Sequence, residues 1–255
     1  MKNNLFIRSE NPVGAASSDY LLKVHNLTKI ENGKKILDQA TFEIAENKIV
    51  GFLGPNGAGK TTTFRILSEL TGYDDGEIYV NGVKLSDLDR KEIMLLPDAP
   101  LLFSVLTGKE YLKFMSELLN FDIDSPEIKE MLQLLGLLNS LNKQIFNYSL
   151  GMKKKLNLIP LLMKKPKLLL LDEYLSGIDP VSMKDIKNIL IQYAQNGCSI
   201  FMSTHQLEVC ERCCDSIILI SNGKILKNNI SISEIKETAS SLEEYYLNVF
   251  STEEG

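Results

Sequence analysis

The sequence of 255 residues has little of what marks a membrane-spanning, secreted or nucleic-acid-binding chain. No apolar stretch approaches the roughly 18 residues that span a bilayer. The N-terminus also lacks the apolar core of a signal peptide. Four cysteines suit a reducing compartment and do not form a disulfide framework. The net charge is −5, whereas a dedicated nucleic-acid binder is usually basic. We therefore expect a chain that stays in the cytosol and has no nucleic-acid partner.

Two local clusters have ordinary explanations. Cys210, Cys213 and Cys214 have no second pair or nearby histidine to complete a metal site, so we expect thiols packed on a helix. The lysine runs 153–155 and 164–165 are expected to be solvated faces rather than a nucleic-acid footprint.

A glycine-rich segment between a strand-like run and a helix-like run is the strongest single feature of the sequence. Such a loop aims backbone N–H groups at phosphate oxygens, and the helix that follows adds partial positive charge. Lys60 would reach the β and γ phosphates, and the Thr61 hydroxyl would hold Mg²⁺. The segment predicted to bind a nucleoside triphosphate comprises Gly54, Pro55, Asn56, Gly57, Ala58, Gly59, Lys60, Thr61 and Thr62.

Hydrophobic patterning predicts an α/β fold with a mostly parallel central sheet. Strand-like runs at 20–24, 35–37 and 41–44, with a hairpin over 76–85, predict a small antiparallel sheet beside it. Helical periodicity replaces the strand pattern from about residue 99 to 163. The predicted organisation is a loose arm over 1–18, one domain over 19–230 with an α-helical subdomain over 99–163, and a helical tail over 231–255.

Local signals predict where several helices begin and end. Gly72 is expected to close the helix that follows the glycine-rich loop. Thr107 opens a capping box, and Ser125 precedes a proline at a first helical position. Pro160 should kink or shorten the helix in which it lies.

Two acids and a histidine follow buried strands. Asp172 and Glu173 end the apolar run 167–171, and His205 follows the strand over 199–203. In a parallel sheet these carboxyl ends face the same crevice as the glycine-rich loop. Asp172 can ligate Mg²⁺, Glu173 can act as a general base, and His205 is a catalytic candidate. The other histidine, His25, lacks such a context and is taken as structural.

The order of these motifs resembles the ATP-binding subunit of an ABC (ATP-binding cassette) transporter, a P-loop NTPase, over about residues 20–230. Residues 54–62 resemble the Walker A motif, and 168–173 the Walker B motif. Residues 148–153 are similar to the family signature, and 176–179 to the D-loop. His205 matches the switch histidine, and Asp98 occupies the Q-loop position.

The resemblance implies an ATPase whose catalytic residues are Glu173, His205 and Lys60, with ATP and Mg²⁺ as cofactors. The metal ligands implied are Thr61, Asp172 and Asp98. Two subunits would dimerise head to tail around ATP, so that one copy's signature reaches the γ-phosphate on the other. The signature residues are Ser149, Leu150, Gly151 and Met152, and Asp179 would contact across the interface.

Two positions depart from the family pattern. Asn32 lies where the family usually carries an aromatic residue that stacks on adenine, which predicts weaker binding of the base. Asp98 replaces a glutamine that contacts Mg²⁺ or the attacking water and senses the membrane partner. Aspartate also offers an oxygen to Mg²⁺, but it is shorter and charged, so the coupling to that partner could differ.

The resemblance favours a motor subunit that lies on the inner face of the cell membrane and pairs with a separate transmembrane permease. The second ATP-binding subunit is an identical copy or a paralogue. Residues 101–112 resemble the matching segment of bacterial drug and peptide exporters, which favours export of a peptide, drug or lipid-like substrate. Two alternatives are a nucleotide-dependent binding module with little hydrolysis and an ABC ATPase outside transport.

Overall fold

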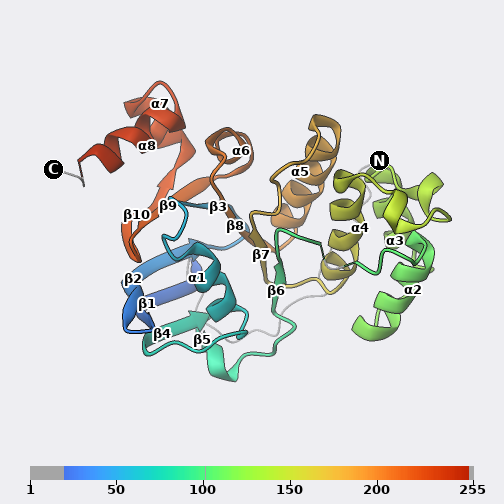
Figure 1. Cartoon of the computed structure of the whole chain (residues 1–255), viewed down its shortest axis with the longest axis horizontal. Coiled ribbons are helices and arrows are strands. Elements are labelled where there is room, and N and C mark those ends of the chain that lie inside the picture. Colours follow the sequence, from blue (N-terminus) through green and yellow to red (C-terminus); the bar gives the residue numbers. More distant parts are fainter. Residues whose placement is uncertain (1–19, 101, 253–255) are drawn as a thin grey trace.

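The computed structural model describes residues 20–100 and 102–252, which form two sheets with helices around them (Figure 1). The arm expected over 1–18 lies outside the described residues. The smaller sheet is antiparallel, with strand order β2-β1-β4-β5, as the sequence predicts. Its strands are β1 (Tyr20–Glu31), β2 (Lys34–Ala45), β4 (Asp75–Val80) and β5 (Val83–Lys84).

The larger sheet has strand order β10-β9-β3-β8-β7-β6. Strands β9, β3, β8, β7 and β6 run parallel, and β10 pairs antiparallel with β9 at one edge. This arrangement confirms the mostly parallel central sheet. Its strands are β3 (Ile49–Leu53), β6 (Ile93–Leu96), β7 (Leu168–Asp172), β8 (Ser199–Thr204), β9 (Ser216–Ser221) and β10 (Lys224–Ser231).

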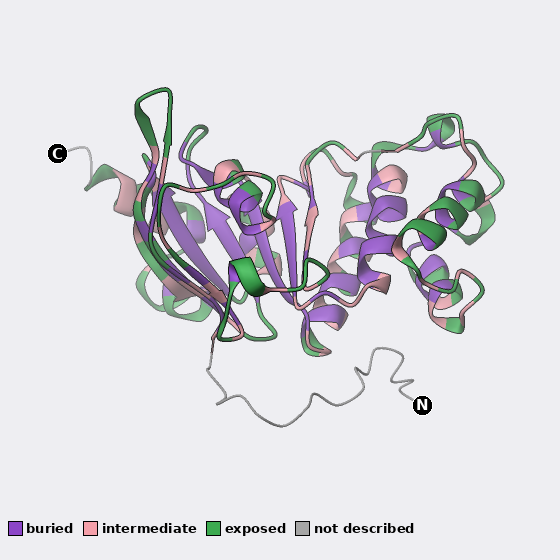
Figure 2. Cartoon of the chain, turned by 90° about the horizontal axis from the view of Figure 1, so that it is seen from below, coloured by how far each residue is buried: buried purple, intermediate pink, exposed green. Residues whose placement is uncertain are grey.

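Burial on both faces explains the apolar composition of the central strands. Every residue of β3 and β8 is buried, and the four leucines of β7 are each 0% exposed. Such runs are typical of parallel strands that are covered on both sides. Figure 2 shows this buried layer through the middle of the molecule, with exposed residues on the outer loops and helix surfaces.

The helices lie around the central sheet, and those between β6 and β7 gather at one end of the molecule (Figure 1). The helix-rich segment between about residues 99 and 163 is therefore observed. The helices are α1 (Lys60–Leu67), α2 (Gly108–Leu119), α3 (Pro126–Leu134), α4 (Leu150–Met163), α5 (Pro180–Gln195), α6 (Leu207–Cys213), α7 (Ile232–Thr238) and α8 (Leu242–Ser251). Three short 3₁₀ turns are η1 (Leu85–Asp87), η2 (Leu138–Ser140) and η3 (Ile145–Asn147).

Several predicted helix ends are confirmed. Thr107 and Glu110 form the capping box of α2, and Ser125 caps α3 with a proline at its first position. At the other end of α3, Gly136 adopts a φ of +68°, the left-handed conformation that terminates helices. These ends follow from local hydrogen bonding, which explains why the sequence predicts them.

One predicted helix end is wrong. Helix α1 ends at Leu67, and Glu69 rather than Gly72 takes the left-handed conformation after it, with a φ of +56°. Pro160 lies inside α4, which continues to Met163, so this proline does not end the helix. Strand β6 was not predicted at all, although its four-residue apolar run directly precedes Pro97 and Asp98.

The lysine run 153–155 is not a solvated face. Lys154 is 1% exposed and Lys155 is 6% exposed, because α4 is buried along most of its surface. Each ammonium group reaches a carboxylate that is distant in sequence: Lys154 pairs with Asp98 at 3.2 Å and Lys155 with Asp185 at 2.6 Å. The local sequence does not reveal these partners.

The cysteines near α6 pack against the sheet. Cys210 is fully buried, and the Cys214 thiol lies 3.4 Å from the Met202 sulfur on β8. Among residues 20–100 and 102–252, no helix combines the length and the apolar character that crossing a bilayer requires.

Candidate functional site: a nucleotide cavity at the end of the parallel sheet

The glycine-rich loop connects β3 to α1 and is held in place by backbone hydrogen bonds. Ala58 N–H donates to the Pro55 carbonyl at 3.2 Å, and Gly223 N–H donates to the Ala58 carbonyl at 3.1 Å. Gly59 has a φ of +109°, a conformation that residues with a side chain rarely adopt. The loop is therefore folded into its turn by contacts within the chain.

The N-terminus of α1 differs from those of α2, α3, α4 and α5. Each of those helices is preceded by an N-cap residue whose side chain accepts a hydrogen bond from the first turn. The N-cap residue of α1 is Gly59, which has no side chain that could accept one. The first turn of α1 contains no acidic residue. Its backbone N–H groups and partial positive charge are thus available to an anion such as phosphate.

The Lys60 ammonium is buried within the loop. Its Nζ donates to the Gly54 carbonyl at 2.6 Å and to the Pro55 carbonyl at 3.1 Å. Burial lowers the pKa of Lys60, while the nearby carboxylates of Glu173 and Asp172 act in the opposite direction. Glu173 and Lys60 line the same cavity.

The two acids stand at the end of β7, beside the end of β8. Asp172 Oδ1 accepts a hydrogen bond from Ser203 Oγ at 2.5 Å. Glu173 N–H donates to the Ser203 carbonyl at 3.1 Å. Glu173 has a φ of +48°, so the backbone turns sharply away from the strand direction at this residue.

His205 contacts the second of these acids. Its Nδ1 lies 2.9 Å from Glu173 Oε2, and the same oxygen accepts a hydrogen bond from Ser176 Oγ at 3.2 Å. The imidazole is mostly exposed and the carboxylate half-buried. The structure thus brings together a carboxylate and an imidazole that the sequence predicts as catalytic partners.

A cavity of about 300 Å³ joins the loop to this acid. Its wall includes Glu31 from β1 and Ile36 from β2, two residues that were not predicted from the sequence. Asn32, which was expected beside the adenine, lies in the hairpin turn with a φ of +50°. Its preceding residue, Glu31, lines the cavity, and the position of Asn32 beside the adenine stays a prediction. The residues that line the cavity are Glu31, Ile36, Asn56, Gly57, Gly59, Lys60, Thr61, Thr62 and Glu173.

The signature residues begin α4 in the helical part of the molecule (Figure 1). Ser149 is the N-cap residue, and its Oγ accepts a hydrogen bond from Met152 N–H at 3.2 Å. Ser149 and Leu150 are exposed, whereas Gly151 is buried. A Cβ at Gly151 would lie 2.6 Å from Ser182 Cβ, so glycine is required here by packing within the same subunit.

Asp179 and Asp98 make their own contacts. Asp179 caps α5, and the hydrogen bond that Ser182 N–H donates to its Oδ1 at 2.9 Å lowers the pKa of this carboxyl. Asp98 Oδ1 lies 3.2 Å from Lys154 Nζ. The structure therefore gives Asp98, expected as a Mg²⁺ ligand, an ionic partner on α4. Thr61 and Asp172 also offer the oxygen atoms that Mg²⁺ prefers, and all three residues stay predicted ligands.

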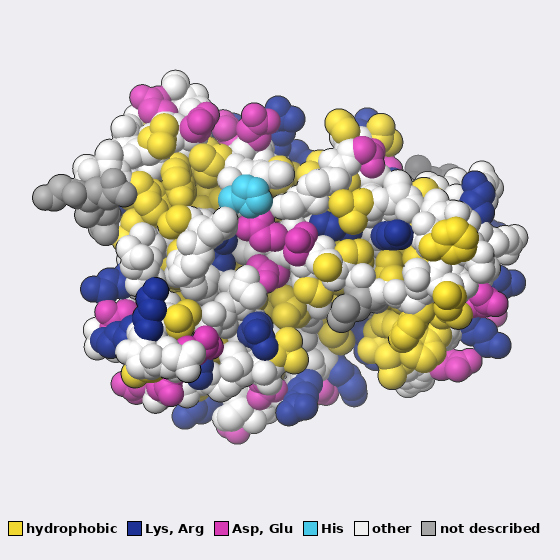
Figure 3. Space-filling view, in the orientation of Figure 1, with side chains coloured by type: hydrophobic (Ala, Val, Ile, Leu, Met, Phe, Trp, Pro, Cys, Tyr) yellow, Lys and Arg dark blue, Asp and Glu magenta, His cyan; other side chains and the backbone are white. Residues whose placement is uncertain are grey.

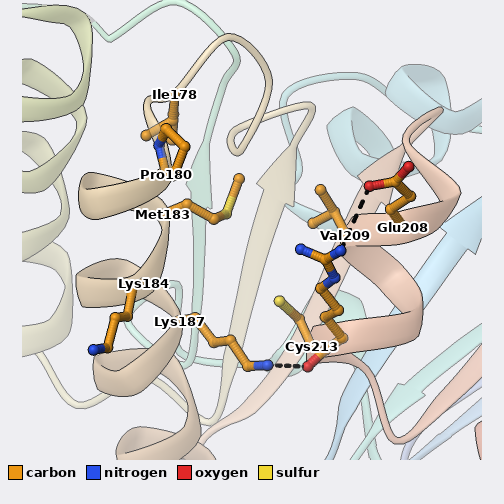
Figure 4. Close-up of a pocket in the computed structure, with 9 residues that line it drawn as sticks. Ile178, Pro180, Met183, Lys184, Lys187, Glu208, Val209 and Cys213 are labelled. Atoms are coloured by element: carbon orange, nitrogen blue, oxygen red, sulfur yellow. Dashed lines mark hydrogen bonds and ion pairs between the residues drawn. The ribbon is translucent and has the colours of Figure 1, made fainter.

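A second cavity, of about 340 Å³, lies between α5 and α6 (Figure 4). It begins at Ile178 and Pro180, on either side of Asp179, and its far wall includes Val209 and Cys213. Lys187 on α5 donates a hydrogen bond to the Arg212 carbonyl on α6. The helices that follow the D-loop position and His205 thus face each other across a partly open space.

Comparison with known proteins agrees with this site. A family model described as "ABC transporter" matches residues 37–176. A solved structure described as the ATP-binding subunit of an ABC transporter superposes with a TM-score of 0.80 at 27% identity, covering 90% of this chain and 99% of that one. A nucleotide-free ATP-binding cassette at 20% identity, with a TM-score of 0.76, supports the fold.

Curated relatives carry the same description. The uncharacterised ABC transporter ATP-binding protein YhcH of Bacillus subtilis is 32% identical over 221 residues, 85% of this chain and 71% of its own. The lantibiotic transport protein SrtF of Streptococcus pyogenes is 32% identical over 81% of this chain and 89% of its own. The bacitracin transport protein BcrA of Enterococcus faecalis is 30% identical over 85% of this chain and 71% of its own. The chain therefore belongs to the ABC transporter family, as an ATP-binding cassette.

Proposed function

We propose that this chain hydrolyses ATP as the motor subunit of an exporter, dimerising around ATP to drive a separate transmembrane permease. The single observation that carries the proposal is the 2.9 Å contact between Glu173 and His205 at a cavity that also contains the phosphate loop. A base, a polar partner for that base and a phosphate site thus lie together, which hydrolysis of a phosphoanhydride requires.

The phosphate loop binds the triphosphate. Backbone N–H groups of the loop and of the uncapped first turn of α1 donate to the phosphate oxygens. The Lys60 ammonium exchanges its contacts with the Gly54 and Pro55 carbonyls for the β and γ phosphates, which restores a counter-charge to a buried cation. Mg²⁺, when bound, offsets phosphate charge, and Thr61 and Asp172 are the residues that would hold it.

Glu173 acts as the general base toward the attacking water. The proton moves from water to the Glu173 carboxylate as the water oxygen attacks the γ-phosphorus and the bond to the leaving β-phosphate oxygen breaks. His205 and Ser176 both contact Glu173 Oε2 and so orient the carboxylate. His205 also holds the γ-phosphate in this mechanism, because its imidazole is mostly exposed and contacts the proposed base.

The signature completes the site from the second subunit. Ser149 and Leu150 are exposed at the start of α4, where a helix N-terminus favours an anion. Ser149, Gly151 and the start of α4 would donate to the γ-phosphate held by the opposite copy, and Asp179 would contact across the interface. Hydrolysis removes these contacts and releases the pair.

An exposed hydrophobic surface on the helical part supports docking of a permease there. Figure 3 shows apolar side chains gathered over α2, and Phe103 packs edge-to-face on Phe114 with ring centres 5.3 Å apart. Clusters of exposed apolar residues mark interaction sites. The exposed residues concerned are Phe103, Val105, Phe114, Leu118 and Phe146.

The names of two relatives support the substrate class. SrtF is described as a lantibiotic transport protein and BcrA as a bacitracin transport protein. We therefore propose a peptide or similar amphiphilic cargo, and a location on the inner face of the membrane through the permease. We also propose a single ATPase domain over 19–230 with its helical subdomain over 99–163 and a short tail over 231–255.

Glu173→Gln tests the proposal in a phosphate-release assay with MgATP. We expect turnover to fall by about 100-fold or more, because the base is lost while the side-chain shape is kept. The variant should accumulate as an ATP-bound dimer, which size-exclusion chromatography detects. Wild-type turnover in Glu173→Gln, or no ATP-dependent dimer, would overturn the mechanism. ATP binding without hydrolysis by the wild type would support the binding-module alternative.

A further inference from the structure

Lys154 is the most deeply buried lysine at the junction between the helical part and the sheet. It is 1% exposed, on α4, one turn after the signature residues. Its Nζ donates to Asp98 Oδ1 at 3.2 Å and to the Ser176 carbonyl at 2.9 Å, and it lies 5.5 Å from the centre of the Tyr174 ring. The ammonium thus contacts two other segments of the chain, at Asp98 and at Ser176, which are 56 and 22 residues away in the sequence.

One of these contacts leads directly to the proposed base. Ser176 uses its carbonyl oxygen to accept from Lys154 and its hydroxyl to donate to Glu173 Oε2 at 3.2 Å. The same carboxylate oxygen contacts His205 at 2.9 Å. Tyr174, the residue after Glu173, donates its hydroxyl to the Lys154 carbonyl. Lys154 therefore holds the segment 173–176 at two points.

The other contact leads to the surface. Asp98 follows β6, and its side chain is 63% exposed although its partner is buried. The segment after Asp98 continues into the exposed hydrophobic residues Phe103 and Val105, which belong to the surface proposed for the permease. The ion pair thus joins that surface to the buried side of α4.

We propose that Lys154 is a positioning residue for ATP hydrolysis, which holds Ser176 and through it Glu173, and that the ion pair with Asp98 keeps its ammonium in place. The inference rests on the proposed function, because it assigns a positioning residue to the same site. It also gives a role to the aspartate at the Q-loop position that differs from metal binding.

The physical basis is the cost of burying a cation. Burying an ammonium is costly unless a counter-charge and hydrogen bonds compensate it, and for Lys154, Asp98 supplies the charge. Loss of the Asp98 carboxylate weakens that compensation, so the ammonium shifts and Ser176 loses its donor. Small displacements of a catalytic group have large effects on rate, since hydrolysis needs the base aligned with the water.

The test compares single and double variants of the pair in the full chain with MgATP. In Lys154→Met we expect kcat to fall about tenfold, with KM for ATP within about twofold of wild type, because the phosphate loop is untouched. Lys154→Arg, which keeps a cation, should restore most of the turnover. Asp98→Asn should lower kcat by about threefold. In the double variant Asp98→Asn/Lys154→Met, kcat should equal that of Lys154→Met, because Asp98 acts only through the ammonium.

Lys155→Met is the matched control. Lys155 is the next residue on α4, is also buried, and pairs with Asp185 at 2.6 Å, but its ion pair leads to α5. This variant should lower the melting temperature and leave kcat unchanged. If Lys154→Met does not fold, the kcat of Asp98→Asn tests the proposal instead, because Asp98 lies at the surface.

Each outcome separates this inference from the proposed function. The positioning role is overturned if the kcat losses of the two single variants multiply in the double variant. It is also overturned if Lys154→Met has the kcat of the wild type. In both cases the proposed hydrolysis of ATP still stands. Equal kcat losses in Lys155→Met and Lys154→Met also overturn it, since both would reflect general destabilisation. Absence of hydrolysis in the wild type, with Glu173→Gln unable to form an ATP-bound dimer, overturns the proposed function itself.

Discussion

The phosphate loop and the start of α4 each contain a buried lysine, but the two lysines are neutralised differently. Lys60 donates to two backbone carbonyls, and burial lowers its pKa. Lys154 donates to a carboxylate as well as a carbonyl and lies near an aromatic ring. Lys60 therefore gains stabilisation when an anion arrives, whereas Lys154 is already compensated within the chain.

The contrast extends to the glycines of the two regions. Gly59 turns the loop with a positive φ and leaves the first turn of α1 without a side-chain cap. Gly151 instead allows α4 to pack against Ser182 and Asp179 on α5. The start of α1 is open to a ligand, whereas the start of α4 packs tightly against its own subunit. The signature residues, which we propose to act on the partner's nucleotide, are thus held in place by contacts within their own subunit.

The largest expected effect that tests this contrast is on Lys60. In Lys60→Met, we expect ATP affinity to fall by about 100-fold, because hydrogen bonds from a cation to phosphate contribute up to ~3 kcal/mol. Binding of a fluorescent ATP analogue measures it. Lys48→Met is the control, since Lys48 forms an exposed pair with Asp215 and such pairs contribute little. Unchanged affinity in Lys60→Met would remove the distinction between the two lysines.

A smaller effect is expected from Gly151→Ala. The new Cβ would lie 2.6 Å from Ser182 Cβ and 2.7 Å from Asp179 Oδ2, so the helices must separate. We expect the free energy of unfolding to fall by about 1–3 kcal/mol, as for other overpacked sites, in a denaturant titration. Gly72→Ala is the control, because an added Cβ there meets no atom within 4 Å. Equal stability of the two variants would contradict the packing role.

The smallest effect is expected from a pair of helix caps. Ser149 caps α4 and Ser125 caps α3, each by accepting from the N–H three residues on. Replacing either with alanine should lower the free energy of unfolding by about 1 kcal/mol. In a Glu173→Gln background, only Ser149→Ala should weaken the ATP-dependent dimer in size-exclusion chromatography. An equal loss of dimer in Ser125→Ala would show that this readout reports stability alone.

Local signals explain what the sequence could predict. The loop, the buried strands around it, and the caps at Thr107, Ser125 and Asp179 depend on neighbours within a few residues. The placement of Asp172, Glu173 and His205 at one edge follows from parallel strand order, which their apolar runs indicate. These parts of the fold and site are encoded in short segments.

Contacts between distant segments explain what the sequence missed. The lysine run on α4 was taken as solvated, but Lys154 and Lys155 find acids 56 and 30 residues away. Glu31 and Ile36 line the cavity because the β1–β2 hairpin, whose turn contains Asn32 and Gly33, lies beside the loop. Strand β6 is only four residues long, and its pairing with β7 decides its conformation.

The positive φ of Glu173 has a consequence for the evolution of the chain. A non-glycine residue in this conformation costs on the order of 1 kcal/mol, which the backbone hydrogen bond to Ser203 must offset. Glycine or asparagine would adopt the same backbone more readily but would lack the proposed base. In the proposed mechanism, selection for turnover therefore keeps a residue at position 173 that selection for folding alone would replace. The most stable chain and the proposed working chain would then differ in sequence at this residue.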